Sequence, residues 1–373
     1  MRRVAVGTIC ALVLALAVAA AAQPATGPAV READFTLRDF HFRSGESLPA
    51  LRLHYRTIGA PIRNETGAVT NAVLILHGTG GSGTQFLRPQ FAGELFGPGQ
   101  LLDANRYFII LPDDIGHGNS SKPSDGLRAR FPHYDYDDMV RAEHALVAEG
   151  LGVSRLRLIL GTSMGCMHAF MWGEMWPSAA RALMPLACLP VAIAGRNRLW
   201  RRMIIDAIKA DSAWNAGDYQ GEPAEGLRTA ADILAIAGSA PRQMQGTMPT
   251  PADVDRYMTG PLSRAFADLD ANDLIYQVDS SRDYDPSAGL GNITAPVMWV
   301  NSADDFINPP ELGVAEREAP RLSKGRFVLL PVSDLTHGHG THTWAVAWKS
   351  YLADLLTSSS NGDGANERHR RTP

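Results

Sequence analysis

Three short apolar runs, each followed at once by a glycine-containing turn, constrain the fold of this chain more than any other feature. They are Val73–Leu76, Tyr107–Leu111 and the run "LRLIL" that ends at Leu160. Apart from Arg157, each run is continuously apolar instead of alternating, as expected for strands that are buried on both faces of a parallel sheet. Stretches with helical spacing follow them or lie between them. This alternation predicts an α/β domain with a mostly parallel central sheet flanked by helices.

Two further strand-like runs, 182–190 and 295–302, are separated by residues with a different sequence pattern. The intervening segment, 191–290, carries amphipathic helical patterns such as "RNRLWRRMIIDAIKAD". A helical excursion between two core strands is typical of an inserted cap. We therefore predict a core in two parts, 30–190 and 291–356, with a helical cap between them.

The N-terminus predicts an exported protein. Arg2 and Arg3 precede a long apolar run, and small residues stand before Gln23, so residues 1–22 resemble a signal peptide. An uncleaved membrane anchor is the alternative, because the run approaches spanning length. No later stretch is long and apolar enough to span a bilayer, so we expect no stable membrane insertion after cleavage. The polar tail, 357–373, is expected to be disordered.

Cysteine usage and charge narrow the chemistry further. Cys166 and Cys188 remain after signal cleavage, and both lie in apolar runs. An exported compartment permits a disulfide, but the apolar surroundings favour two buried thiols. The net charge of -4 and the lack of a basic stripe with interleaved aromatic residues argue against a nucleic-acid partner.

A serine lies between a buried-strand run and a helical run, in Gly161-Thr162-Ser163-Met164-Gly165. This G-x-S-x-G spacing is typical of a sharp strand-to-helix turn that exposes a strained serine hydroxyl. The flanking glycines let neighbouring backbone approach closely because they carry no Cβ. The following helix places its N-terminus, which favours negative charge, beside the serine. We predict that Ser163 is a nucleophile; the alternative is a glycine turn with an incidental serine.

A serine nucleophile needs amide donors for the oxyanion that forms during acyl transfer. The N–H of the next residue, Met164, is one expected donor. The second should come from the loop after an earlier strand, where "LHGTGG" stands. We predict the Thr79 N–H as that donor, with the Gly78 N–H as the second choice.

The acid of such a site is expected after a late core strand, since the chain order is serine, then acid, then histidine. "MWVNSADDFINPPE" offers Asp304 and Asp305 at this place. Asp305 stands four residues before Pro309, a usual spacing of the acid ahead of a turn proline, so we predict Asp305 and keep Asp304 as the second choice. Its role is to orient an imidazole and stabilise the imidazolium.

The stretch "THGHGTH" near the C-terminus contains His337, His339 and His342. Their H-x-H-x-x-H spacing resembles the metal-binding box of metallo-β-lactamase-type hydrolases, with Thr341 in place of the aspartate. Such sites take further ligands from later in the chain, and only His369 follows. We therefore predict no metal site and keep a metallohydrolase as a minor alternative.

The general-base interpretation needs one histidine on the loop after the last strand. Gly338 and Gly340 flank His339 and let its ring approach both partners, so we predict His339 as the base. His337 is the second choice. His342 is expected to begin the closing helix.

With these residues assembled, the chain resembles an α/β-hydrolase-fold enzyme, and more narrowly the homoserine O-acetyltransferase family. The resemblance covers roughly residues 45–355. It is densest from Phe131 to Pro177, where an Asp-Met-Val helix, a Leu-Gly-Val turn and the Ser-Met-Gly elbow follow in the family's order. "DAIKADSAWNAGDY" in the cap and "PPE" after the acid also match. The resemblance implies that Ser163 takes an acetyl group from acetyl-CoA and passes it to a hydroxyl.

The departures from the family pattern concern substrate recognition. Thr162 stands where the family has a second glycine, and the loop His77–Gly81 is closer to an esterase loop than to the family's His-Ala-Leu-Thr-Gly. Gly340 stands where an acidic residue usually meets the substrate amine. This chain is therefore expected to recognise something other than homoserine.

The cap shows a second departure of the same kind. The family arginine that clamps the substrate carboxylate falls on Ile205, and Arg201 and Arg202 lie about one helical turn away. These two arginines, and Tyr219 at the end of the matching cap stretch, are our substrate-binding candidates. Loss of both charge partners would forfeit much of the recognition of an amino-acid zwitterion.

We predict an exported serine enzyme that acts on a small-molecule ester or acyl donor through an acyl-enzyme intermediate. Hydrolysis is favoured over transfer, because acetyl-CoA is a cytoplasmic metabolite. No cofactor is expected; acetyl-CoA would be a co-substrate only if the chain is an acetyltransferase. A homodimer is possible. The alternative of another class is a non-catalytic binding protein on a hydrolase scaffold.

Overall fold

The computed structural model describes residues 29–265 and 269–360. The expected signal peptide, 1–22, lies outside these residues. Within the described ranges, no helix combines the length and the apolar character that crossing a membrane requires. The last helix, α11 (Lys349–Ser358), continues past residue 357, where we placed the start of the tail, because Leu355 and Leu356 on it are buried. The rest of that tail, 361–373, lies outside the described residues.

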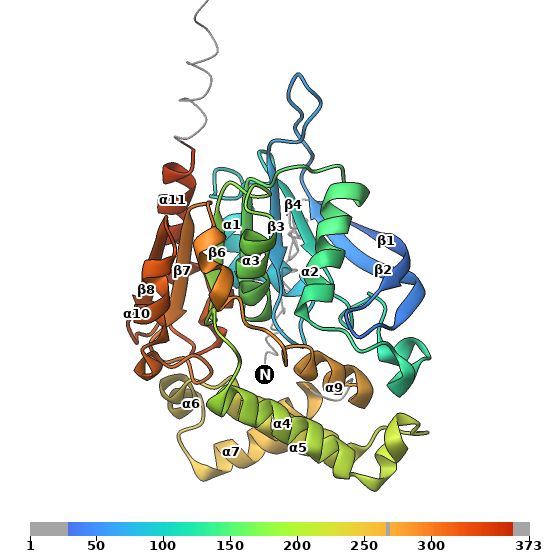
Figure 1. The fold of residues 1–373 in the computed structure, drawn as a ribbon. Helices are drawn as coiled ribbons and strands as arrows, with labels where there is room; N and C mark the ends of the chain where they lie inside the picture. Colours follow the sequence, from blue (N-terminus) through green and yellow to red (C-terminus); the bar gives the residue numbers. More distant parts are fainter. Residues whose placement is uncertain (1–28, 266–268, 361–373) are drawn as a thin grey trace, which may run out of the picture.

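A mixed eight-stranded sheet forms the centre of the described chain (Figure 1), with the strand order β1-β2-β4-β3-β5-β6-β7-β8. The strands are β1 (Val30–His41), β2 (Ser47–Ile58), β3 (Ala72–Leu76), β4 (Phe108–Pro112), β5 (Leu158–Thr162), β6 (Leu183–Leu186), β7 (Val297–Ser302) and β8 (Gly325–Leu330). The β1–β2 and β2–β4 pairs are antiparallel, and all other pairs are parallel. The predicted mostly parallel sheet is confirmed.

The continuous apolar runs form the inner strands, where every residue of β3, β4 and β5 is buried. Successive residues face opposite sides of the sheet. Leu74 and Ile110 belong to one hydrophobic core, and their neighbours Val73 and Ile109 belong to the other. The long β1–β2 hairpin was not among the predicted strands, because its exposed outer strand β1 carries no apolar run.

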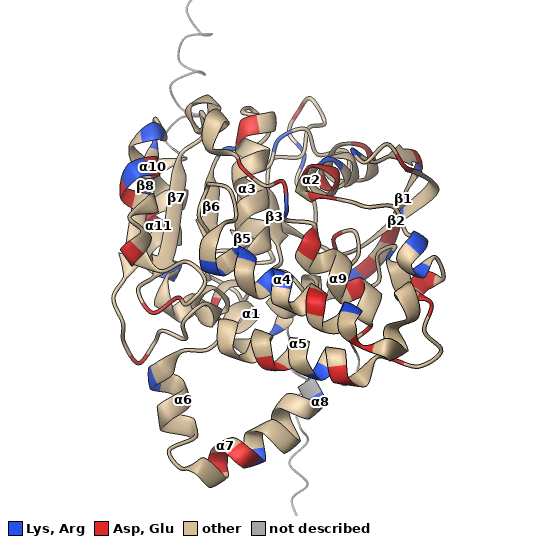
Figure 2. Cartoon of the chain, turned by 60° about the horizontal axis from the view of Figure 1, so that its bottom comes forward, with Lys and Arg blue, Asp and Glu red and all other residues tan. Residues whose placement is uncertain are grey.

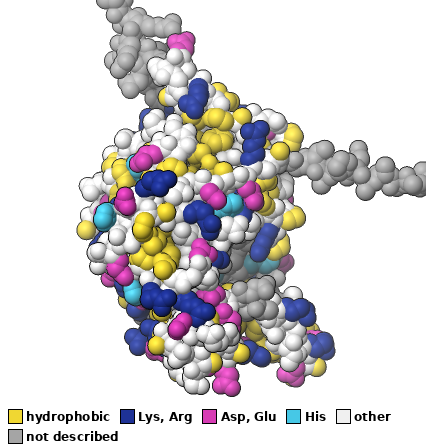
Figure 3. Space-filling view, turned by 90° about the vertical axis from the view of Figure 1, so that its right-hand side faces the viewer, with side chains coloured by type: hydrophobic (Ala, Val, Ile, Leu, Met, Phe, Trp, Pro, Cys, Tyr) yellow, Lys and Arg dark blue, Asp and Glu magenta, His cyan; other side chains and the backbone are white. Residues whose placement is uncertain are grey.

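Helices cover both faces of the sheet. On one side lie α2 (Tyr136–Ala145) and α3 (Met164–Met175), and on the other α1 (Pro89–Leu95) and α11, so each core is closed by its own helices. Near the last strands lies the short α10 (Val314–Glu318). On the face that carries β1 and β2, basic and acidic side chains are interspersed among apolar ones (Figure 3).

The chain between β6 and β7 is helical where it is described. Its helices are α4 (Gly195–Ala210), α5 (Ala224–Ala237), α6 (Pro241–Thr247), α7 (Pro251–Tyr257), α8 (Ser263–Ala265) and α9 (Ala271–Asp279). In Figure 1, α4 to α7 lie together at one end of the sheet, and in Figure 2 α6 and α7 project from the rest of the described chain. Helix α9 differs from these, because nearly all of its residues are buried.

Cys166 and Cys188 form a disulfide, which corrects the prediction of two buried thiols. Cys166 lies in the first turn of α3 and Cys188 follows β6, and neither is exposed to solvent. The parallel pairing of β5 with β6 brings these places together. A separation of 22 residues in sequence hides this contact, and the apolar surroundings that suggested free thiols describe buried cystine equally well.

Candidate active site

Ser163 occupies the turn between β5 and α3 in a backbone conformation that is rare for a residue with a side chain. Its φ and ψ are 54° and -108°. Positive φ of this kind stores strain, which is common at functional sites. A Cβ on Gly161 would overlap the carbonyl oxygen of Gly165, and a Cβ on Gly165 would overlap that of Leu76. The two glycines are therefore required for the turn that presents Ser163.

His339 lies between the serine and a buried carboxylate. Its Nε2 is 2.7 Å from Ser163 Oγ, and its Nδ1 is 2.9 Å from Asp305 Oδ2. An Nδ1–H that donates to the carboxylate leaves the Nε2 lone pair to accept the serine hydroxyl proton. Ser163 is 8%, His339 9% and Asp305 2% exposed, so all three side chains are largely shielded from solvent.

Asp305 is fixed by donors from its own loop. The amides of Ile307 and Asn308 donate to Oδ1 at 2.8 and 3.1 Å, and Asn308 Nδ2 donates to Oδ2 at 3.0 Å. Burial acts to raise the pKa of Asp305, but the His339 ring and the Asn308 donors outweigh it, and the pKa lies below its ordinary value. Asp305 is therefore ionised at neutral pH. Sequence reasoning missed Asn308; its only signal is a polar residue three places after the acid.

The second-choice residues hold the histidine loop. Asp304 Oδ2 accepts hydrogen bonds from Thr336 Oγ1 at 2.9 Å and from the Gly338 amide at 3.1 Å. The His337 ring stacks on Trp344 with 4.1 Å between centroids, and burial lowers its pKa. Neither Asp304 nor His337 bonds to Ser163 in the described chain.

His342 does not begin the closing helix, which corrects that expectation. It lies in a 3-10 turn, Gly340–Thr343, and α11 begins only at Lys349, because Trp344 and Trp348 have non-helical backbone angles. Burial lowers the pKa of His342 to about 3, so it is neutral beside the His339 ring.

The three histidines of this loop do not share a metal-binding geometry. His339 uses both ring nitrogens in hydrogen bonds, one to Asp305 and one to Ser163. The His337 ring stacks on the Trp344 ring. No lone pair of His339 is left for a metal ion.

The loop after β3 lies against the serine, as an oxyanion loop must. A Cβ on Gly78 would lie 3.2 Å from Ser163 Cβ. The Gly165 amide donates to the His77 carbonyl at 2.9 Å, which joins this loop to the start of α3. Met164 is the first residue of α3, so its N–H has no acceptor within the helix. Both predicted amide sources therefore flank Ser163, and the choice between Thr79 and Gly78 stays a prediction.

Thr162, which replaces a glycine of the resembled family, has a structural role. Its Oγ1 donates to the Leu76 carbonyl at 3.1 Å and accepts from Gln85 Nε2 at 3.0 Å. The side chain thereby joins the ends of β3 and β5 below the nucleophile.

The substrate-binding candidates of the cap bond to other cap residues. Arg201 is 2% exposed and donates to Asn197 Oδ1 at 3.0 Å. Arg202 pairs with Asp206 at 2.7 Å on the surface of α4. The Tyr219 hydroxyl donates to Asp270 Oδ2 at 2.7 Å. These bonds do not bring the three side chains to Ser163, and their role in binding stays a prediction.

A mostly apolar cavity of about 520 Å³ adjoins the acid loop. Asn308, which bonds to Asp305, and Met167, one turn after Ser163 on α3, both line it. Ile193 and Leu189 line it from the segment that leads into the cap. An apolar part of a substrate could lie there.

Comparisons with known proteins agree with this architecture. Residues 71–333 match the family described as alpha/beta hydrolase fold. A homoserine O-acetyltransferase of Pelobacter propionicus is 30% identical over 351 residues, which cover 83% of this chain and 91% of that protein. One from Thermobifida fusca is 36% identical over 205 residues, and that match spans only about half of each protein, 51% and 52%.

A solved structure has the same fold. An acetylester hydrolase from Corynebacterium glutamicum superposes with a TM-score of 0.77 at 20% identity, over 88% of this chain and 96% of that one. The chain is thus similar in sequence to acetyltransferases and in fold to an ester hydrolase.

Proposed function

This chain belongs to the α/β-hydrolase fold family, within its homoserine O-acetyltransferase-like group, and from this premise we propose that it is a Ser-His-Asp enzyme that forms an acyl-enzyme. Ser163 is the nucleophile, His339 the general base and acid, and Asp305 the residue that orients the ring. The observation that carries the proposal is the 2.7 Å contact between His339 Nε2 and Ser163 Oγ, with Nδ1 held by a buried, ionised Asp305.

The reaction begins when Ser163 Oγ attacks the carbonyl carbon of an ester and His339 Nε2 takes the hydroxyl proton. The carbonyl oxygen becomes an oxyanion, which the amides of Met164 and of Thr79 or Gly78 stabilise. Asp305 stabilises the imidazolium that forms. When the tetrahedral intermediate collapses, the bond to the alcohol oxygen breaks and His339 returns the proton to that oxygen, which leaves an acyl-Ser163.

We propose water as the second acceptor, so that the enzyme is an ester hydrolase. His339 then deprotonates water, which attacks the carbonyl carbon of the acyl-serine. When this second tetrahedral intermediate collapses, the bond to Ser163 Oγ breaks, His339 returns the proton to Oγ, and the carboxylic acid leaves. Two departures from the resembled family support this choice: Gly340 offers no carboxylate for a substrate amine, and Ile205 offers no guanidinium for a substrate carboxylate. The expected signal peptide, which would export the protein, argues the same way.

Acetyl transfer from acetyl-CoA to a hydroxyl is the second candidate. It is supported by the sequence similarity to homoserine O-acetyltransferases over most of the chain. It would use the same three residues, with an alcohol in place of water.

An acyl-ester panel from acetyl to octanoyl, with and without acetyl-CoA and homoserine, separates the two candidates. We expect ester hydrolysis that needs neither CoA nor a metal, survives a chelator and is lost in Ser163→Ala. Turnover that requires the CoA thioester would replace hydrolysis by transfer. Activity that a chelator abolishes would revive the metallohydrolase, and a chain that turns over nothing in the panel would support the binding-protein alternative.

A further inference from the structure

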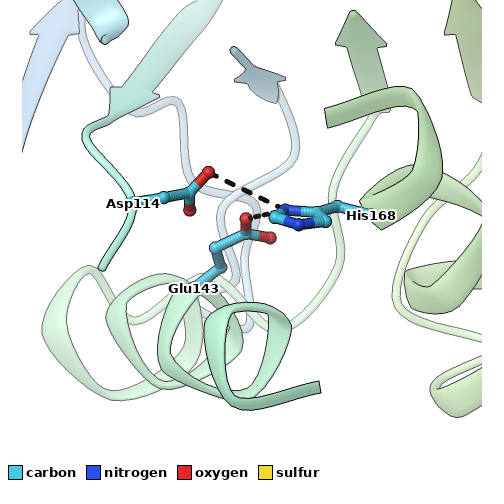
Figure 4. A group of neighbouring side chains, drawn as sticks. All are labelled: Asp114, Glu143 and His168. Carbon is cyan, nitrogen blue, oxygen red and sulfur yellow. Dashed lines mark hydrogen bonds and ion pairs between the residues drawn. The ribbon is translucent and has the colours of Figure 1, made fainter. Parts of the chain in front are cut away.

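A second carboxylate–histidine group lies buried beneath the nucleophile turn. Asp114 follows β4, Glu143 lies on α2, and His168 lies on α3, five positions after Ser163 (Figure 4). Their exposed fractions are 1%, 1% and 0%. The mechanism above uses none of them.

The hydrogen bonds of this group define which atoms carry protons. Glu143 Oε1 lies 2.7 Å from His168 Nδ1, and Oε2 accepts from Trp172 Nε1 at 2.6 Å. Both oxygens of Glu143 thus face donors. Asp114 differs, because no donor lies within hydrogen-bonding distance of either of its oxygens in the described chain. His168 Nδ1 is 3.7 Å from its Oδ2 (Figure 4), and its carboxyl group faces Glu143.

Two adjacent buried carboxylates cannot both be ionised without a compensating cation. His168 does not supply that charge, since burial lowers its pKa to about 4. Burial and the charge of Glu143 raise the pKa of Asp114 well above its ordinary value. A proton on Asp114 resolves the problem, because its O–H becomes a third donor to Glu143.

The geometry of His168 argues against a metal ion in this place. A metal on Nδ1 would force the ring proton onto Nε2, and Nε2 has no acceptor among the described residues. Histidine ligands almost always donate their other ring N–H. The neutral ring that donates from Nδ1 to Glu143 leaves only an unused lone pair, which costs less than a buried, unsatisfied N–H.

Asp114 also connects this group to the loop beside Ser163. Its backbone amide donates to His77 Nε2 at 3.1 Å, and His77 Nδ1 donates to the Gly78 carbonyl at 2.9 Å. The His77 ring therefore accepts one hydrogen bond at Nε2 and donates another from Nδ1. The carbonyl oxygen of His77 accepts a third from the Gly165 amide. This chain of bonds therefore begins at the backbone of the residue whose side chain lies beside Glu143.

We propose that Asp114 and Glu143 are positioning residues that share one proton and so hold the His77–Gly78 loop in place to supply the oxyanion amide. The proposal rests on the proposed function for its kinetic part only. The titratable groups that face Asp114 are Glu143, His168, His77 and Tyr134, and the His117 ring packs against His77. Of these, Glu143 is the one whose ionisation conflicts with that of Asp114.

The test compares Asp114→Asn with Asp114→Ala and Glu143→Gln. Asparagine reproduces the donor of a protonated aspartate, so we expect kcat within about threefold of wild type. Alanine removes the donor, and we expect kcat to fall about 10- to 100-fold with KM nearly unchanged, since the loss falls on the oxyanion. In Glu143→Gln, the donating NH2 of the amide would face groups that are themselves donors. We therefore expect kcat to fall at least about tenfold. Asp334→Asn, an exposed carboxylate, is the control for the loss of one charge.

Thermal unfolding between pH 5 and pH 9 tests the proton without any activity. The folded chain keeps the Asp114 proton over a range where the unfolded chain releases it, so wild-type stability falls as pH rises through that range. We expect the Tm of Asp114→Asn relative to wild type to rise by at least about 2 °C from pH 5 to pH 9, and that of Asp334→Asn to stay level.

A Tm difference that does not change with pH, or equal kcat losses in Asp114→Asn and Asp114→Ala, would overturn the proposal. Failure of the proposed function looks different: wild type would then hydrolyse no ester, while the unfolding series would still support or refute the shared proton.

Discussion

Two of the buried carboxylate–histidine pairs in the described residues, Asp305–His339 and Glu143–His168, differ in what the far ring nitrogen meets. His339 takes its Nδ1 partner from Asp305 and presents Nε2 to the Ser163 hydroxyl. His168 takes its Nδ1 partner from Glu143, and its Nε2 meets nothing in the described chain. His339 is 9% exposed, whereas His168 is fully buried. A similar pair of side chains thus faces a serine hydroxyl in one place and meets no further polar partner among the described residues in the other.

The largest expected difference is between His339→Ala and His168→Ala. Removing His339 should lower kcat/KM about 10⁴-fold or more, because the serine loses its base, and should leave Tm nearly unchanged. Removing His168 takes away the donor to Oε1 of the buried Glu143, so it should mainly lower Tm. Esterase assays measure kcat/KM and calorimetry measures Tm for both variants. A His168→Ala protein that keeps its Tm but loses all activity would break the comparison.

One substitution, Asp→Asn, should separate the two acids. Asp305 is ionised, and an amide there favours the wrong ring tautomer, so Asp305→Asn should cost about 10⁴-fold in kcat. Asp304→Asn should cost about tenfold at most, because Asp304 acts through the backbone of the histidine loop. Similar losses in both variants would mean that the acid is wrongly assigned.

The lowered pKa of Asp305 also makes a pH prediction for stability. The folded carboxylate stays ionised at a pH where the unfolded one is already protonated. The stabilisation is therefore complete above the ordinary pKa of 3.8 and is lost as pH falls through the lower folded pKa. In urea unfolding between pH 3 and pH 7, wild type should lose more stability toward acid than Asp305→Asn does. Parallel curves for the two proteins would contradict this sign.

The disulfide holds the helix turn that lies between Ser163 and His168. Cys166→Ser with Cys188→Ser should lower the free energy of unfolding by about 3 kcal/mol, from the loop that the bond closes. Thiol titration of the denatured, unreduced wild type should detect neither cysteine. Two titratable thiols would restore the interpretation that the sequence favoured.

The smallest effect is expected for His337→Ala. Its ring packs on Trp344 instead of the serine, so kcat should change by less than about threefold. A variant as inactive as His339→Ala would show that the base had been misassigned within this loop.

Local sequence signals were sufficient for one pair and insufficient for the other. Ser163 lies two residues from a glycine on either side, His339 stands between glycines, and Asp305 follows a buried strand, so motif spacing and chain order were enough to predict that these three side chains meet. Asp114, Glu143 and His168 come from three elements and carry no shared motif, and only the pairing of the strands and the packing of α2 against α3 brings them together. The Cys166–Cys188 disulfide escaped prediction for the same reason, because it depends on the contact between β5 and β6.

In the cap, comparison of sequences did not predict the contacts of the arginine side chains. The position of the family arginine could be counted to Ile205, but the hydrogen bonds of Arg201 and Arg202 depend on how α4 packs. Arg201 is buried and bonded to Asn197, and Arg202 is paired with Asp206. Specificity therefore has to be measured with substrates.

The most direct measurement of the central claim is labelling with a fluorophosphonate, followed by mass spectrometry of the intact protein and its peptides. The wild type should gain one phosphonyl group on the peptide that contains Ser163, Ser163→Ala should gain none, and His339→Ala should react far more slowly. Equal labelling of wild type and Ser163→Ala would contradict the assignment of Ser163 as the nucleophile.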